Sequence, residues 1–217
     1  MDSAELDLVL GARDVVVVEG GDAESYLHSQ LSQSVAGMAT GEQRWTFVLQ
    51  PTGKIDVLAR ITRTGDSRFE LDTDAGFGDE LLARLERFKI RVDATLTLWA
   101  AEGAATADEV ARIALGWPRM GAEIVPGETI PAGTGLTKLA VDVTKGCYPG
   151  QELVERMDSR SAEAPKSLRR LNVADGTSVG DPVVDGGGDV GTVTSVAGTT
   201  ALGWVKRSSE LGDVVQF

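Results

Sequence analysis

The stretch Lys145-Gly146-Cys147-Tyr148-Pro149-Gly150-Gln151-Glu152 contains the single cysteine of this 217-residue chain. Two glycines and a proline bracket the cysteine, and a short run with helical periodicity follows over residues 151–157. Proline is favoured at the first position of a helix, so the pattern predicts a helix that begins at Pro149. Cys147 is then expected just outside a helix N-terminus, where unpaired N–H groups and the helix dipole favour negative charge.

This position makes Cys147 a candidate functional thiol. A helix N-terminus and a nearby cation favour the thiolate form, and Lys145 lies two residues before the cysteine. Glu152, in the first turn of the expected helix, acts in the opposite direction. The alternative is a structural role, because a lone free cysteine is often inert packing. The setting between glycines and a proline favours function, since loop residues at special backbone angles carry function more often.

Length and composition set the broad class. A chain with 42% hydrophobic residues can bury a sizeable core in one large domain, or in one domain with a small companion. No apolar run approaches the ~18 residues of a membrane-spanning helix, and the acidic start of the chain lacks the pattern of a signal peptide. We therefore expect a soluble, cytoplasmic protein without membrane association.

The formal net charge of −12 argues against direct, sequence-independent binding to nucleic acid, which needs a cationic surface. The best candidate for a local basic patch is Arg169-Arg170, which follows Lys166 closely. A solvated strand start is the favoured explanation of these residues. A mildly acidic surface mainly supports solubility.

Hydrophobic periodicity predicts a body that mixes strands and helices. Residues 117–136 are rich in glycine and proline and are expected to form an extended excursion, and residues 138–143 fit either a short helix or a strand. The expected elements are a β-branched strand at 13–18, a helix from an N-cap at Asp22 to about Val35, strands at 44–49 and 55–62 joined by a turn at 50–54, a strand at 68–72, a helix at 78–89, a one-sided strand at 91–99, and a helix opened by the capping box Thr106–Glu109 and ended by Gly116.

The composition changes near residues 159–165. Short apolar runs separated by glycine, aspartate and serine follow, a spacing that predicts a small barrel or sandwich. These runs cover residues 168–173, 182–184, 190–196, 200–205 and 214–217. We therefore place a domain boundary near residue 164, between domains 1–164 and 165–217.

Several other site types are disfavoured by the sequence. Gly186–Gly191 matches G-x-G-x-x-G but leads into a strand pattern, so a turn is expected in place of a dinucleotide site. One cysteine and one histidine per chain cannot supply the four ligands of a zinc or iron–sulfur site except by sharing between chains, so no resident metal is expected. A nucleophile–base pair of Cys147 with His28 is disfavoured, because a histidine on a helix is more often surface or packing.

The quoted stretch resembles the K-G-C-Y-x-G-Q-E signature of the YgfZ family, folate-binding proteins related to the glycine-cleavage T-protein. All seven fixed positions of this eight-residue signature match, and only the fifth position is free. Residues 25–31 and 49–54 resemble the early helix and the strand–turn of that family more loosely. Residues 129–136 resemble the approach to the signature, although Gly133 stands where glutamate is common in the family.

The resemblance implies a T-protein-like α+β body around a central folate pocket, carried by residues 1–164, and a small C-terminal β-barrel at 165–217. It implies tetrahydrofolate or a derivative as cofactor, and a role as an accessory protein in assembly or repair of iron–sulfur clusters, including those of tRNA-modifying enzymes. Iron–sulfur client or assembly proteins are the implied partners. Cys147 is the implied active position, supported by the other motif residues, namely Lys145, Gly146, Tyr148, Gly150, Gln151 and Glu152.

The alternative implied by the relation to the T-protein is a folate-dependent one-carbon enzyme of the aminomethyltransferase type. The catalytic aspartate of the T-protein follows the turn glycine by a few residues. Asp56 lies near that position, but the register is not fixed by the sequence, and no transferase chemistry is assigned to it.

Overall fold

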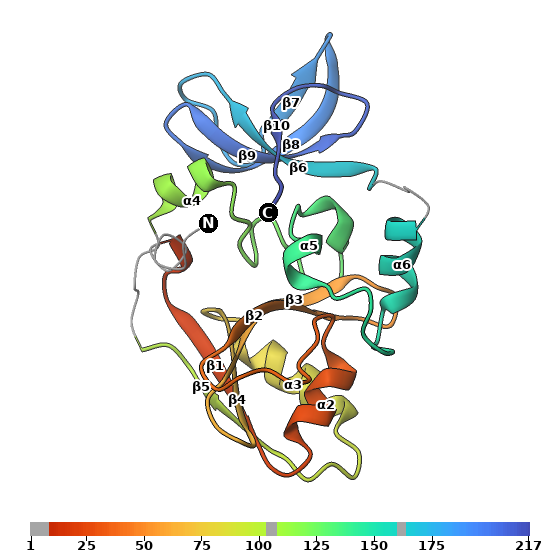
Figure 1. The fold of residues 1–217 in the computed structure, drawn as a ribbon. Helices are drawn as coiled ribbons and strands as arrows, with labels where there is room; N and C mark the ends of the chain where they lie inside the picture. The colour runs from red at the N-terminus through yellow and green to blue at the C-terminus, as the bar shows by residue number, and fades with distance from the viewer. Residues whose placement is uncertain (1–8, 103–107, 160–163) are drawn as a thin grey trace.

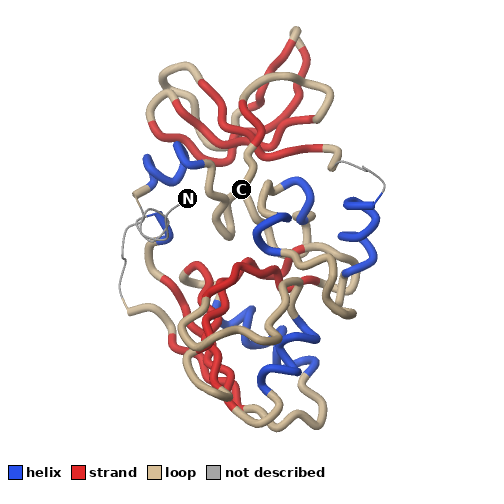
Figure 2. The backbone as a smooth tube through the Cα atoms, in the orientation of Figure 1, coloured by secondary structure: helices blue, strands red, loops and turns tan. Residues whose placement is uncertain are grey.

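The computed structural model describes residues 9–102, 108–159 and 164–217 of the chain (Figure 1). These residues form two antiparallel sheets, with helices α4 (Glu109–Leu115), α5 (Thr137–Ala140) and α6 (Gln151–Ser159) between them. Figure 2 shows that much of the remaining chain between the sheets is loop. The expected mixture of helices and strands is confirmed. None of the helices in the described ranges is long and apolar enough to cross a membrane.

The first sheet has five antiparallel strands in the order β2-β3-β4-β1-β5. Its β-branched strand lies between β4 and β5, and Val16 and Val18 on it have no exposed surface. The strands predicted at 13–18, 44–49, 55–62 and 68–72 and the turn at 50–54 are confirmed. In chain order the strands are β1 (Arg13–Glu19), β2 (Gln43–Leu49), β3 (Ile55–Arg63), β4 (Arg68–Asp74) and β5 (Thr95–Trp99).

This sheet is buried on both faces. Helices α2 (Ala23–Gln30) and α3 (Gly78–Phe88) pack on one face, where Val48 joins the cluster that they form. On β2 the neighbouring residues Phe47 and Leu49 belong instead to the cluster on the other face, as the two-residue period of a strand requires. The excursion after α4 and the segment with the cysteine cover that second face, through residues such as Trp117 and Tyr148.

Helix α2 is shorter than predicted. It ends at Gln30, because Leu31 forms an isolated antiparallel bridge with Val48. The Ser32 hydroxyl accepts from Phe47 N at 2.8 Å and donates to Ala140 O at 2.7 Å. These hydrogen bonds tie Ser32 to β2 and to α5, so the chain does not continue as a helix there. Asp22 also does not cap the helix with its side chain, which accepts a hydrogen bond from Asp93 N at 2.8 Å.

The structure refines the bounds of two further predicted elements, the strand at 91–99 and the helix that Gly116 ends. The strand expected over 91–99 begins at Thr95, and Trp99 at its end is 65% exposed. Helix α4 is capped by Asp108, whose carboxylate accepts from Ala111 N at 3.0 Å. The first two residues of the expected capping box, 106 and 107, lie outside the described residues. Gly116 ends this helix in the left-handed conformation, as predicted.

The second sheet has the order β10-β6-β9-β8-β7, again antiparallel. A small C-terminal β unit is therefore present. The pairings of the described residues form an open five-stranded sheet and do not join β10 to β7 as a closed barrel would. The glycines at 186 and 187 form the β7–β8 turn, as expected. Its strands are β6 (Lys166–Asn172), β7 (Pro182–Asp185), β8 (Gly188–Ala197), β9 (Thr200–Lys206) and β10 (Asp213–Val214).

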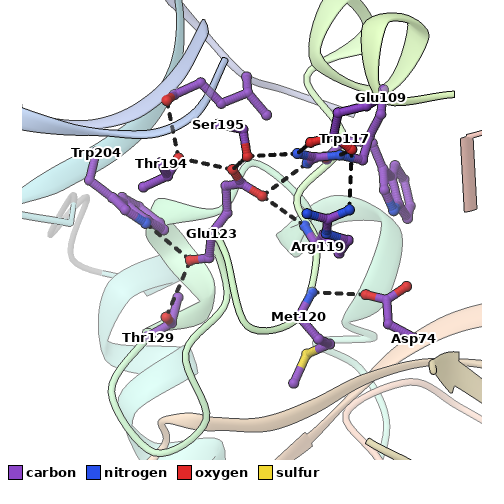
Figure 3. Close-up of polar contacts among 12 residues, drawn as sticks. Asp74, Glu109, Trp117, Arg119, Met120, Glu123, Thr129, Thr194, Ser195 and Trp204 are labelled. Carbon is purple, nitrogen blue, oxygen red and sulfur yellow. Dashed lines mark hydrogen bonds and ion pairs between the residues drawn. The ribbon is translucent and has the colours of Figure 1, made fainter. Parts of the chain in front are cut away.

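A buried polar cluster joins the excursion to the second sheet (Figure 3). Glu123 has no exposed surface and forms an ion pair with Arg112, with Oε2 and Nη1 2.9 Å apart. Its other carboxylate oxygen accepts from Ser195 Oγ at 2.5 Å and from Thr194 Oγ1 at 2.9 Å, both on β8. The backbone carbonyl of Glu123 accepts from the Trp204 indole at 3.0 Å. The described contacts give this cluster a structural role in holding the two sheets together.

Candidate functional site around Cys147

The segment with the cysteine is docked on the β2–β3 turn through two glycines. Gly150 and Gly53 have φ angles of +85° and +84°. A Cβ on Gly150 would lie 2.5 Å from Gln50 O and 2.9 Å from Gly53 Cα, and a Cβ on Gly53 would lie 2.4 Å from Leu153 Cβ. Only glycine tolerates both the backbone angle and the contact distance. The signature at 145–152 and the stretch 49–54, which both resemble the YgfZ family, are therefore in direct contact.

Helix α6 begins later than predicted, at Gln151 and not at Pro149. Gln151 N donates to Tyr148 O, and Tyr148 N donates to Gln151 Oε1, each at 3.3 Å. These bonds fix the turn that leads into the helix, because Gly150 in the left-handed conformation cannot be a helical residue. Cys147 is exposed and lies four residues before Gln151. The dipole field of a helix decays within its first turn, so α6 acts on Cys147 less than the sequence suggested.

Lys145 is buried against the end of α2 and is 9% exposed. Its Nζ donates to the carbonyls of His28 and Leu31, the latter at 2.6 Å, and lies 4.6 Å from the centre of the Tyr148 ring. Burial lowers the pKa of Lys145 to about 8, while the charges of Asp142 and Cys147 act in the opposite direction. Lys145 therefore caps the last carbonyls of α2, in addition to placing a cation two residues from the thiol.

Tyr148 packs in the cluster on the second face of the first sheet and is 7% exposed. Burial, and then the charges of Glu155 and Asp142, raise the pKa of its phenol to about 12, so the group stays neutral at ordinary pH. Its buried hydroxyl has no hydrogen-bond partner among the described residues. Buried hydroxyls without a partner are rare in proteins and carry a free-energy cost.

His28 lies closer to the cysteine segment than the sequence suggested, since its carbonyl binds Lys145. Its Nδ1 accepts from Val35 N at 3.2 Å and from Ala36 N at 3.4 Å. Burial, and then the charge of Lys145, lower its pKa. With Nδ1 used as an acceptor, the neutral ring carries its proton on Nε2 and cannot take a proton there. His28 thus has a structural arrangement and does not present a free base.

Asp56 belongs to a polar group beneath the same turn. It is 8% exposed and forms an ion pair with Arg84, with Oδ2 and Nε 3.4 Å apart. Arg84 is 7% exposed and donates from Nη2 to Leu49 O at 2.8 Å, while its Nε, despite the ion pair, and its Nη1 have no hydrogen-bond partner among the described residues. Burial, followed by the charge of Asp56, raises the pKa of Glu80. Sequence reasoning did not single out Arg84, although an arginine on the apolar face of α3 was a visible signal.

Gly133 stands where glutamate is common in the resembled family, and its surroundings explain the glycine. A Cβ at this position would lie 2.8 Å from both Lys166 O and Trp204 Cζ3. A glutamate side chain therefore does not fit, because the segment packs directly against β6 and β9. The described residues also contain no group of three or more histidine, cysteine, aspartate or glutamate side chains placed to hold a metal ion.

A cavity of about 600 Å³ has residues 214–217 in its wall. This C-terminal segment runs between the two sheets (Figure 1). The wall of the cavity includes Leu115, Leu139, Arg170 and Phe217. Leu115, Leu139 and Phe217 pack against the apolar cluster that contains Tyr148. The cavity and Tyr148, the residue after Cys147, therefore border the same apolar cluster. Its volume is in the range of small-molecule sites.

Comparisons with known proteins agree with this architecture. No protein-family model matches the chain. An uncharacterized protein from Haemophilus influenzae is 26% identical over 188 residues, which cover 68% of this chain and 67% of the relative. The crystal structure of glycine cleavage system aminomethyltransferase T from Bartonella henselae superposes with a TM-score of 0.79 at 16% identity, over 94% of this chain and 81% of that chain. The chain therefore has the fold of this aminomethyltransferase.

Proposed function

We propose that this protein is a folate-binding accessory protein of the YgfZ type, acting in assembly or repair of iron–sulfur clusters, including those of tRNA-modifying enzymes. The observation that carries the proposal is the exposed Cys147 on a segment that Gly150 and Gly53 lock onto an aminomethyltransferase fold. An exposed thiol on a fixed loop is available to a partner protein. Iron–sulfur client or assembly proteins are the expected partners, and the cluster is cargo of the reaction.

We place tetrahydrofolate, or a derivative of it, in the 600 Å³ cavity beside the C-terminal segment. The residues of its wall fit a folate in chemical character. Phe217 offers an aromatic surface for a pterin ring, Leu115 and Leu139 offer apolar contact, and Arg170 is a cation for the carboxylates of the glutamate part. When bound, folate would supply a one-carbon carrier next to the cluster on which Tyr148 packs.

Calorimetric titration with tetrahydrofolate tests the folate part of the proposal. We expect saturable binding at micromolar concentrations, and weaker binding by Phe217→Ala, which removes the aromatic surface. Trp99→Ala is the matched control, because Trp99 is 65% exposed on β5 and lies outside the cavity wall. Absence of saturable binding by the unmodified protein would refute the folate role.

The role of the thiol is tested by complementation. Cys147→Ser, introduced into a cell that lacks the native gene, is expected to leave iron–sulfur enzyme activity at the level of the deleted strain. Val143→Ser is the control, since Val143 is an exposed neighbour of the same segment at 52% exposure and should restore activity fully. Full rescue by Cys147→Ser would show that the thiol is not used.

The second candidate is a folate-dependent aminomethyltransferase, which the fold favours. The ion pair of Asp56 with Arg84 counts against it, because a buried and paired carboxylate is not free to act on a substrate. The two functions are separated by measuring aminomethyl transfer to tetrahydrofolate with the unmodified protein and with Asp56→Asn. Transfer that is lost in Asp56→Asn would favour the enzyme over the accessory protein.

A further inference from the structure

A second cavity, of about 510 Å³, lies between α6, the segment 130–138 and β6 of the second sheet. Apolar side chains form most of its wall, among them Ile130, Pro131, Leu153, Val154 and Met157. Three cationic residues, Lys138, Arg169 and Arg207, complete it, and its described wall contains no acidic side chain. This composition is unusual in a chain with a net charge of −12. A cavity with apolar walls and cations among its lining residues has the character of a site for an organic anion.

Arg169 is the decisive residue of this cavity, because it is only 5% exposed. The sequence favoured a solvated strand start here, and that interpretation is wrong for Arg169. Its Nε donates to Ser167 Oγ at 3.2 Å and its Nη1 to Leu211 O at 2.9 Å. The described residues give its Nη2 no acceptor and the guanidinium no carboxylate partner. A buried cation without a counter-charge is costly, and an anion in the cavity would remove that cost.

Strand geometry explains why the two neighbouring arginines differ. Successive side chains on a strand point to opposite faces, so Arg169 and Arg170 on β6 line different cavities. Lys138 is exposed and belongs to the wall of the second cavity, where it adds positive charge. Arg207 is also exposed and lines the same cavity.

We propose that this second cavity binds a small organic anion, a carboxylate or a phosphate monoester on an aromatic or aliphatic body, with Arg169 as its main anion contact. Guanidinium groups bind both anions through charge-assisted hydrogen bonds. Cys147 is not in the described wall of the cavity, so the site is distinct from the thiol. The two cavities share Val214 and Gln216 in their walls and are therefore neighbours.

The test measures binding of three probes to the full chain by calorimetry and by amide chemical shifts. Indole-3-acetate and phenyl phosphate represent the two anions, and indole-3-ethanol is the neutral analogue of the first. We expect saturable binding of at least one anion, with the neutral analogue weaker by about tenfold or more. The stronger anion identifies the class of ligand. Equal binding of indole-3-acetate and its neutral analogue, or binding of neither anion, would overturn the proposal.

Variants then locate the anion. Arg169→Met, which keeps the length of the apolar stem, is expected to weaken binding of the anion by about tenfold or more. Lys166→Met removes a cation from the same strand at an exposed position outside the cavity wall, and should leave binding unchanged. Unchanged binding by a folded Arg169→Met protein would contradict the assignment.

Two further measurements keep the proposal testable if Arg169→Met does not fold. Ala132→Trp places a large side chain in the cavity wall and is expected to abolish binding of the probe while the fold is kept. Retained binding by this variant would contradict the location. Tetrahydrofolate is then added to the complex with the probe. Competitive displacement of the probe would show one shared folate site and overturn the separate anion site, whereas failure of tetrahydrofolate to bind at all would affect only the proposed function.

Discussion

At the scale of single residues, the cysteine segment depends on close backbone contacts more than on side-chain chemistry. Gly150 touches the β2–β3 turn, while Gly146 in the same motif has no atom of the described residues within 4 Å of the position where its Cβ would lie. Gly146 also does not adopt a positive φ. The two glycines of one signature therefore have different physical reasons to be present, and substitution distinguishes them.

We predict that Gly150→Ala lowers the free energy of unfolding by about 2 kcal/mol or more, because both its φ of +85° and its contact with Gln50 O oppose a side chain. Gly146→Ala is the matched control and should change stability by less than about 0.5 kcal/mol. Urea unfolding of both variants measures the difference. Equal effects would contradict the docking of the segment on the turn.

The pKa of Lys145 predicts how the stability of the folded protein changes with pH. Burial lowers its pKa in the folded protein to about 8 from the ordinary value of 10.5. Between these values the unfolded chain binds more protons than the folded one, so stability rises with pH and the penalty for burying the ammonium disappears. The unmodified protein should therefore gain up to about 3 kcal/mol relative to Lys145→Met between pH 8 and 10.5. A stability difference that stays constant across this range would show that Lys145 has its ordinary pKa when folded.

At the scale of elements, the helices follow their sequence signals where no tertiary bond competes. Helix α3 begins at Gly78 and buries Leu81 and Leu85, as the periodicity predicted. Helix α4 has Asp108 as its N-cap and Gly116 after its last residue. Helix α2 is cut short because Leu31 pairs with Val48. Its last carbonyls are bound by Lys145, a residue more than a hundred positions away.

The cap of α4 is tested by Asp108→Ala. Removing the carboxylate that accepts from Ala111 N is expected to cost about 1 kcal/mol of stability. Val110→Ala is the control in the same helix, because Val110 is 67% exposed and contributes little to the core. Chemical denaturation provides the comparison. A smaller cost for Asp108→Ala than for the control would refute the capping role.

At the scale of the whole molecule, the two sheets are joined by the excursion between α4 and α5. Trp117 packs against Trp45 of the first sheet, with ring centres 4.7 Å apart, and against Phe217 near the C-terminus at 5.2 Å. The cluster around Glu123 fixes the same excursion to β8 and β9. The division into domains 1–164 and 165–217 falls between α6 and β6 and stays a prediction.

Two carboxylates bind Arg112, and they differ in burial. Glu123→Gln removes the fully buried one and is expected to cost about 3 kcal/mol or more, because it leaves a buried guanidinium short of its counter-charge. Glu109→Gln is the matched control. The Glu109 side chain is 36% exposed, and its loss should cost less than about 1 kcal/mol. Thermal and urea unfolding measure the loss of stability in the two variants. Equal losses would contradict the structural role of Glu123.

The sequence by itself determined the features that local patterns encode. The β-branched run at 13–18, the two strands around the turn at 50–54, the helix from Gly78 and the strand-rich C-terminal part all follow from periodicity and turn residues. These signals act between near neighbours in the chain, so they survive without knowledge of the fold. The motif around Cys147 was likewise visible as a stretch, together with the exclusion of a dinucleotide site at 186–191.

Tertiary structure alone decided how these parts meet. Only the folded chain places Gly150 against Gly53, buries Arg169 with no carboxylate partner among the described residues and pairs Arg84 with Asp56. It also moves the start of α6 to Gln151 and the end of α2 to Gln30. These outcomes depend on hydrogen bonds and contacts between residues far apart in sequence, and no local pattern contains them. The geometry of the candidate sites therefore comes from packing, while the sequence supplies their chemical groups.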